Sequence, residues 1–143
     1  MTDEVAPYNS DEEVLEVVCK FESCEYAPDD FKHRLHLTVA LKYLLDSSYA
    51  DALERMRIGL HRFIKHHNLS GVYHETLTVF WVRRVLAYVE GSDRTRGLTQ
   101  LANELNEACA DSRLVFDYYT KERLESDKAR RYWLDSDLKP LDF

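Results

Sequence analysis

The stretch LTVFWVRRVLAYVE, residues 77–90, decides the fold class of this chain. Apolar side chains recur in it at every third or fourth position, the spacing that places them along one side of an α-helix. The residues on that side are Leu77, Trp81, Val82, Val85, Tyr88 and Val89. The other side also carries the apolar residues Val79, Phe80 and Leu86. We therefore predict that this helix, which ends at Gly91, is the most buried helix of the protein.

The same spacing continues toward the N-terminus and predicts three more helices. They cover about residues 11–26, 29–46 and 49–67. The connections between them are short, which makes helices that follow one another antiparallel. We therefore expect the first four helices to form an up-down bundle.

Beyond the fourth helix, residues 95–110 have the pattern of a fifth amphipathic helix. The tail that follows is less regular, but its many apolar residues, such as Phe116, Trp133 and Phe143, suit a segment that packs back over the bundle. We predict a single all-α domain over residues 1–143, made of four core helices, a fifth helix and a helical C-terminal tail. Residues 1–10 are polar and acidic, and we expect them to be flexible.

The composition agrees with a helical, soluble protein. The 143 residues include only four Gly and three Pro, too few for the tight turns of a β-sandwich or barrel. The net charge of −7 disfavours nucleic acid as a partner. The three cysteines show no C-x-x-C spacing, and no run approaches the roughly 18 apolar residues of a membrane span. We expect a cytoplasmic protein with neither a membrane nor a nucleic-acid partner.

Six titratable residues are expected at one end of the predicted bundle. In an up-down arrangement, the ends of helices one and three lie level with the starts of helices two and four. The six residues at those positions are Glu22, His33, His36, His67, His74 and Glu75. The helical wheel turns several of them toward the core, where a polar group has to be satisfied by a partner.

A metal ion is one partner that would satisfy these groups. Imidazole and carboxylate ligands bind zinc, iron or another divalent first-row metal, and bundle cores are a common place for such sites. The predicted ligands are His33, His36, His74 and Glu22. Glu75 would then act as a general base on a metal-bound water, or it would cap its own helix. His67 is expected to end helix three rather than to join the site.

Two other functions also fit the sequence. In the first, the same polar end binds a small organic ligand without a metal, and the predicted ligand-contacting residues are Tyr73, Thr78 and Trp81, together with Tyr43. In the second, the His and Glu residues only hydrogen-bond one another, and the protein serves as an interaction or structural module that forms homo-oligomers. The sequence contains no P-loop, dinucleotide-binding or nucleophile-elbow motif that would name an enzyme class.

Three motifs resemble those of a group of small bacterial proteins that have no assigned activity. The motifs are FKHRLHL at residues 31–37, GVYHETLT at residues 71–78, and a tail in which Trp133 precedes Asp137-Leu138 and Pro140-Leu141. The resemblance implies a shared compact helical fold and a shared polar site. It does not imply a substrate.

Overall fold

The computed structural model describes residues 6–143 and contains helices but no β-strand in that range. The five longer helices are α1 (Asp11–Glu22), α2 (His33–Asp46), α3 (Tyr49–His66), α4 (Glu75–Glu90) and α5 (Leu98–Ala108). The C-terminal part forms the 3₁₀ helix η1 (Ser112–Asp117) and two short helices, α6 (Lys121–Glu125) and α7 (Asp127–Arg131). The predicted all-α class, with a fifth helix and a helical tail, is confirmed. No helix in this range is long and apolar enough to cross a membrane.

Side-chain caps explain where several helices begin. The Ser10 hydroxyl accepts a hydrogen bond from the Glu13 N–H at 3.3 Å and starts α1. Ser48 does the same for α3 through the Asp51 N–H at 3.2 Å. The end of α1 falls at Glu22 rather than near residue 26, because Cys24 takes a left-handed conformation with φ of 59°.

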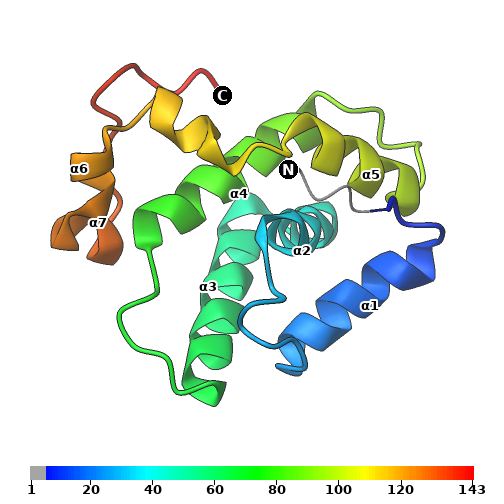
Figure 1. The fold of residues 1–143 in the computed structure, drawn as a ribbon. Coiled ribbons are helices and arrows are strands. Elements are labelled where there is room, and N and C mark those ends of the chain that lie inside the picture. The colour runs from blue at the N-terminus through cyan, green and yellow to red at the C-terminus, as the bar shows by residue number, and fades with distance from the viewer. Residues whose placement is uncertain (1–5) are drawn as a thin grey trace.

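Helix α2 is the centre of the molecule. Figure 1 looks nearly along its axis, with α1, α3, α4 and α5 arranged around it, and α2 contacts each of the four. Its buried residues are Leu37, Thr38, Val39, Ala40, Leu41, Tyr43 and Leu44, and they cover all sides of the helix. The prediction that the fourth helix is the most buried is therefore wrong, because α4 has fewer buried residues than α2 although it is longer.

The C-terminal tail packs against α4, as its apolar composition predicts. Phe80 of α4 is fully buried in a second apolar cluster with Val115, Tyr118, Tyr119 and Leu124. The Thr76 hydroxyl adds polar contacts between α4 and the tail. It donates a hydrogen bond to the Ala129 carbonyl oxygen at 2.7 Å and accepts one from the Leu134 N–H at 3.2 Å. In Figure 1, α6 and α7 lie beside the N-terminal end of α4.

The segment before α1 is attached to the bundle from Ala6 onward. The Tyr8 side chain is buried, its hydroxyl lies 2.9 Å from the Thr38 hydroxyl, and its N–H donates to Asn103 at 2.8 Å. The Arg34 guanidinium stacks 4.0 Å from the centre of the Tyr8 ring. Residues 6–10 thus make defined contacts with the bundle, residues 1–5 lie outside the described range, and the expected flexibility of residues 1–10 stays a prediction.

Candidate functional site

A cavity of about 560 Å³ lies between α2, α3 and α4. Its walls come from the facing sides of these helices, from the segment that precedes α2 and from the loop that joins α3 to α4. The lining residues are Pro28, Phe31, His33, His36, Leu37, Ala40, Met56, Leu60, Phe63, Ile64, Leu69, Val72, Tyr73, His74, Leu77, Thr78, Trp81 and Val82. This set contains no Asp, Glu, Lys or Arg, so the cavity is apolar with a few uncharged polar groups.

The loop before α4 closes one side of the cavity. Asn68 and Gly71 adopt left-handed conformations with φ of 54° and 67°, which turn the chain after α3. This turn carries Leu69 and Val72 to the cavity wall. His67 is the C-terminal cap of α3 and directly precedes the loop. The place where α3 ends therefore sets where the loop begins.

His33, the first residue of α2, is held by a distant backbone carbonyl. Its Nε2 lies 2.8 Å from the carbonyl oxygen of Cys109. A carbonyl oxygen only accepts, so Nε2 carries the proton. Burial lowers the pKa of His33, with the Cys109 carbonyl opposing this in part, and the imidazole is neutral at pH 7. Its edge meets the Trp81 ring, with ring centres 4.5 Å apart.

His36 lies one turn further along α2 and contacts aromatic rings. Its ring centre is 4.1 Å from that of Phe31, which in turn stacks on Phe21 at 4.6 Å. Burial lowers the pKa of His36 to about 4, and the Phe31 backbone opposes this only in part. His36 is therefore a neutral polar group at the cavity wall at physiological pH.

His74 caps α4 and bridges to the C-terminal tail. Its Nδ1 accepts a hydrogen bond from the Leu77 N–H at 3.2 Å, and its Nε2 donates to the Leu124 carbonyl oxygen at 2.7 Å. Both ring nitrogens are thus occupied by the backbone. Burial lowers the pKa of His74, which keeps the ring in the neutral form that this arrangement needs.

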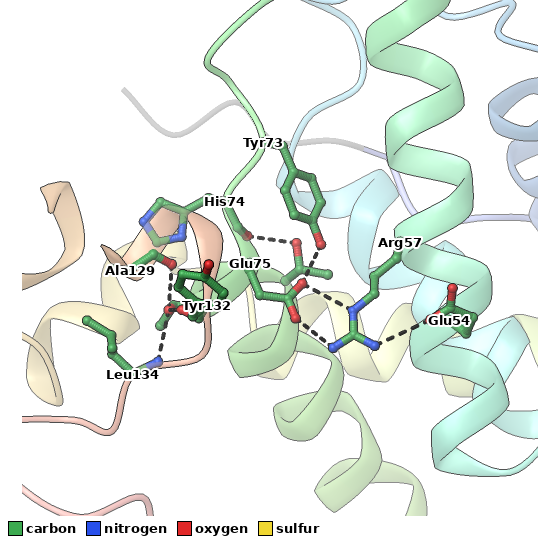
Figure 2. Close-up of polar contacts among 10 residues, drawn as sticks. Glu54, Arg57, Tyr73, His74, Glu75, Ala129, Tyr132 and Leu134 are labelled. Carbon is green, nitrogen blue, oxygen red and sulfur yellow. Dashed lines mark hydrogen bonds and ion pairs between the residues drawn. The ribbon is translucent and has the colours of Figure 1, made fainter. Parts of the chain in front are cut away.

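Glu75, the first residue of α4, forms an ion pair with Arg57 of α3. Arg57 Nε lies 3.1 Å from Oε1, Arg57 Nη2 lies 2.6 Å from Oε2, and the Tyr73 hydroxyl donates to Oε1 at 2.6 Å. Burial alone would raise the pKa of Glu75, but the hydrogen bonds from Arg57 and Tyr73 lower it overall. Figure 2 shows Glu75 turned toward Arg57 and His74 turned to the other side, toward the tail.

Glu22 lies away from the cavity and is exposed to solvent. Its Oε2 accepts a hydrogen bond from the Tyr43 hydroxyl at 2.9 Å, and the Arg55 guanidinium is 4.0 Å away. Tyr43 is itself fully buried and does not line the cavity. Neither residue lines the cavity that His33 and His74 share.

The predicted metal ligands therefore do not form a coordination site. Within residues 6–143, no group of three or more His, Cys, Asp and Glu side chains is placed so that it could hold a metal ion. His33 and His74 bind backbone carbonyls through Nε2, His36 packs against Phe31, and Glu22 pairs with Tyr43. Glu75 is held by Arg57 and Tyr73 and does not line the cavity, so its geometry does not suit a general base.

The observed arrangement is closer to the predicted organic-ligand site than to the predicted metal site. Tyr73, Thr78 and Trp81 all line the cavity. The Thr78 hydroxyl donates to the His74 carbonyl oxygen at 2.9 Å, and the Tyr73 hydroxyl is occupied by Glu75. Arg57, which holds Glu75, was not found from the sequence, because no spacing rule connects a residue of α3 with the start of α4.

Searches against protein-family models, curated proteins and solved structures each found no match. The resemblance to a group of small bacterial proteins stays a prediction. Fold and cavity together define the chain as a small all-helical protein with a largely apolar pocket that is open to solvent on one side. Its function has to be argued from that pocket.

Proposed function

We propose that the protein is a binding module for a small, mostly apolar molecule that occupies the cavity between α2, α3 and α4. The observation that carries this proposal is the cavity itself, with a volume of about 560 Å³ and no charged side chain in its wall. Pockets of this size and polarity are typical of ligand sites.

The wall combines aromatic contact surfaces with a few polar groups. Phe31, Phe63 and Trp81 offer ring surfaces for an apolar ligand. His33 and His36 add neutral imidazoles that select orientation through hydrogen bonds. Such a wall favours neutral ligands, because no cation or anion is present to pair with a ligand charge.

Binding of naphthalene tests the proposal. A ligand that binds only the folded protein raises its stability, by about 2.7 kcal/mol at 100 times the dissociation constant. We expect a concentration-dependent rise in Tm and a shift of the Trp81 indole N–H resonance in ¹⁵N NMR spectra. Trp133, the other tryptophan of the chain, lies outside the cavity wall and serves as the internal control.

A cavity-filling variant and a matched control connect binding to this site. Ala40→Leu adds apolar atoms to the wall, while Ala50→Leu adds the same atoms at an exposed position of α3. We expect Ala40→Leu to weaken naphthalene binding and Ala50→Leu to leave it unchanged. Absence of any Tm rise or Trp81 shift with the unmodified protein, or equal weakening by both variants, would overturn the proposal.

A further inference from the structure

We propose that the natural ligand carries an uncharged hydroxyl group, which donates a hydrogen bond to Nδ1 of His33 and accepts one from the indole N–H of Trp81. This inference rests on the proposed function, because it names the chemical class of the molecule that enters the same cavity. It would make the ligand a neutral phenol or alcohol on an apolar frame.

The acceptor on the protein is Nδ1 of His33. Because Nε2 donates to the Cys109 carbonyl oxygen at 2.8 Å, the neutral ring has an unprotonated Nδ1 with a free lone pair. Among residues 6–143, no side chain or backbone group donates to this atom. A ligand that enters the cavity can supply the missing donor.

The donor on the protein is Nε1 of Trp81. An indole N–H in a half-buried position usually has a hydrogen-bond partner, and that of Trp81 has none within the described part of the chain. Fully buried side-chain nitrogens and oxygens without a partner occur there only in His67 and Asn106. Nδ1 of His33 and Nε1 of Trp81 are therefore unpaired yet accessible, as ligand-binding atoms must be.

The two side chains that carry these atoms are in contact. The His33 and Trp81 rings meet edge to face, with their centres 4.5 Å apart, and both side chains line the cavity. A hydroxyl oxygen both donates and accepts, so a single oxygen can satisfy the two rings. An ether or carbonyl oxygen could only accept from Trp81, and an ionised oxygen would find no cation in the wall.

The other polar groups of the wall have partners already. Both nitrogens of His74 bind the backbone, Thr78 binds the His74 carbonyl oxygen, and the Tyr73 hydroxyl donates to Glu75. His36, further along α2, contacts the Phe31 ring and has the Phe31 backbone as its hydrogen-bond partner. Among the cavity-lining residues of the described range, the contact between His33 and Trp81 thus combines a free acceptor with a free donor.

A series of naphthalene derivatives tests the inference with one apolar frame. The probes are naphthalene, 2-naphthol, 2-methoxynaphthalene and 2-naphthoate, and their dissociation constants are measured at pH 7.5 by titration of the Trp81 NMR signal. Each net hydrogen bond contributes roughly a three- to tenfold gain in affinity. We expect 2-naphthol to bind about tenfold tighter than naphthalene, 2-methoxynaphthalene to lie between them, and 2-naphthoate to bind weakest.

Two variants assign the hydrogen bonds to their residues. His33→Phe keeps a ring but removes Nδ1, and Trp81→Phe keeps an aromatic surface but removes the N–H. For these variants the dissociation constants are obtained from the change in Tm on addition of the probe. Within each variant, the ratio of the naphthalene dissociation constant to the 2-naphthol dissociation constant is compared, because altered packing affects both probes alike. We expect the ratio to fall about threefold or more in both. His66→Phe, on the exposed last residue of α3, is the matched control and should keep the ratio of the unmodified protein.

The outcomes separate this inference from the proposed function. If naphthalene binds but 2-naphthol binds no tighter, the hydroxyl assignment is overturned and the apolar pocket remains. The same holds if the ratio survives His33→Phe and Trp81→Phe. If naphthalene itself does not bind, the proposed function fails and the inference fails with it.

Discussion

Arg57 and Glu75 connect α3 to the first residue of α4 through two parallel hydrogen bonds, with Nε to Oε1 at 3.1 Å and Nη2 to Oε2 at 2.6 Å. The Glu75 side chain is only 15% exposed. Tyr73 adds a third hydrogen bond to the same carboxylate from the loop that precedes α4. The ion pair therefore holds the loop, the start of α4 and the middle of α3 together beside the cavity.

Arg57→Gln is expected to destabilise the protein by about 2 kcal/mol. A two-point pair with a mostly buried carboxylate is worth more than a surface ion pair, and removal of the cation leaves Glu75 without its main partner. Urea denaturation of the unmodified and variant proteins measures the loss. In a double-mutant cycle with Glu75→Gln, the two substitutions should lose less than the sum of their separate effects.

Lys121→Gln is the matched control for that cycle. Lys121 pairs with Glu125 at 3.7 Å, but both side chains are more than half exposed. Its loss should cost less than about 0.5 kcal/mol. If Arg57→Gln costs no more than Lys121→Gln, the ion pair does not hold α3 and α4 together.

His74→Ala is expected to cost about 2 kcal/mol, because it removes the α4 cap and the hydrogen bond to the Leu124 carbonyl oxygen. His74→Asn should recover about 1 kcal/mol of this, since a short amide can cap the helix but cannot reach Leu124. Thermal and urea unfolding of the two variants measure the difference. Equal stabilities of the two variants would contradict the capping role.

Elemental analysis of the same proteins tests the metal hypothesis independently. Since both His74 nitrogens bind backbone groups, we expect no stoichiometric zinc or iron in the unmodified protein and no effect of EDTA on its Tm. His33→Ala should leave the metal content unchanged as well. One bound metal per chain that disappears in both alanine variants would reinstate the coordination site predicted from the sequence.

The helices could be predicted because their signal is local. Apolar residues at three- and four-residue spacing and the caps at Ser10 and Ser48 are visible in short stretches of sequence. The steep crossing of α2 by its neighbours depends on how side chains fit between helices, which spacing along one helix does not encode (Figure 1). This is why α4 was predicted to be the most buried helix, whereas α2 holds that place in the structure.

The candidate site could be predicted only as a region. His33, His36, His74, Tyr73, Thr78 and Trp81 do line one cavity. The hydrogen-bond partners of the histidines could not be predicted. His33 binds a backbone carbonyl 76 residues away in sequence, and His74 binds one 50 residues away. Any residue type supplies a backbone carbonyl, so no sequence pattern marks these contacts. The metal hypothesis followed from treating those imidazoles as unpaired.

The stability of the protein should fall between pH 6.5 and about 4. In the folded state, burial lowers the pKa of His36 to about 4 and also lowers those of His33 and His74. In this window the unfolded chain binds more protons than the folded protein, so acid favours unfolding. We expect a loss of about 1–2 kcal/mol from His36 between pH 6.5 and 4.5, measured by urea denaturation.

His36→Gln separates this effect from the acidic side chains. The variant should be less sensitive to pH between 6.5 and 4.5, while His66→Gln, at an exposed position, should behave like the unmodified protein. The pKa of Glu75 is lowered from 4.5, so its contribution is lost mainly below that pH. An unfolding free energy that stays constant down to pH 4.5 would show that the buried imidazoles do not resist protonation.

Gly59→Ala tests how tightly α1 packs on α3. A Cβ at residue 59 would lie 2.5 Å from Cε2 of Phe21, whose ring is fully buried and stacked on Phe31. Alanine stabilises a helix by about 1 kcal/mol relative to glycine, but overpacking a rigid core costs roughly 1–3 kcal/mol. Because the Phe21 ring is fully buried and packed against Phe31 and Phe63, we expect the cost to prevail, with a net loss of about 1–2 kcal/mol.

Two further variants test whether the Phe21 ring causes the loss of stability in Gly59→Ala. In a Phe21→Leu background the clash is relieved, so Gly59→Ala should become neutral or stabilising because only the helix propensity of alanine remains. Gly91→Ala is the control, since its Cβ would meet nothing closer than the Ala87 carbonyl oxygen at 3.4 Å. If Gly59→Ala is equally harmful with leucine at position 21, then contacts other than the Phe21 ring limit the approach of α1 to α3.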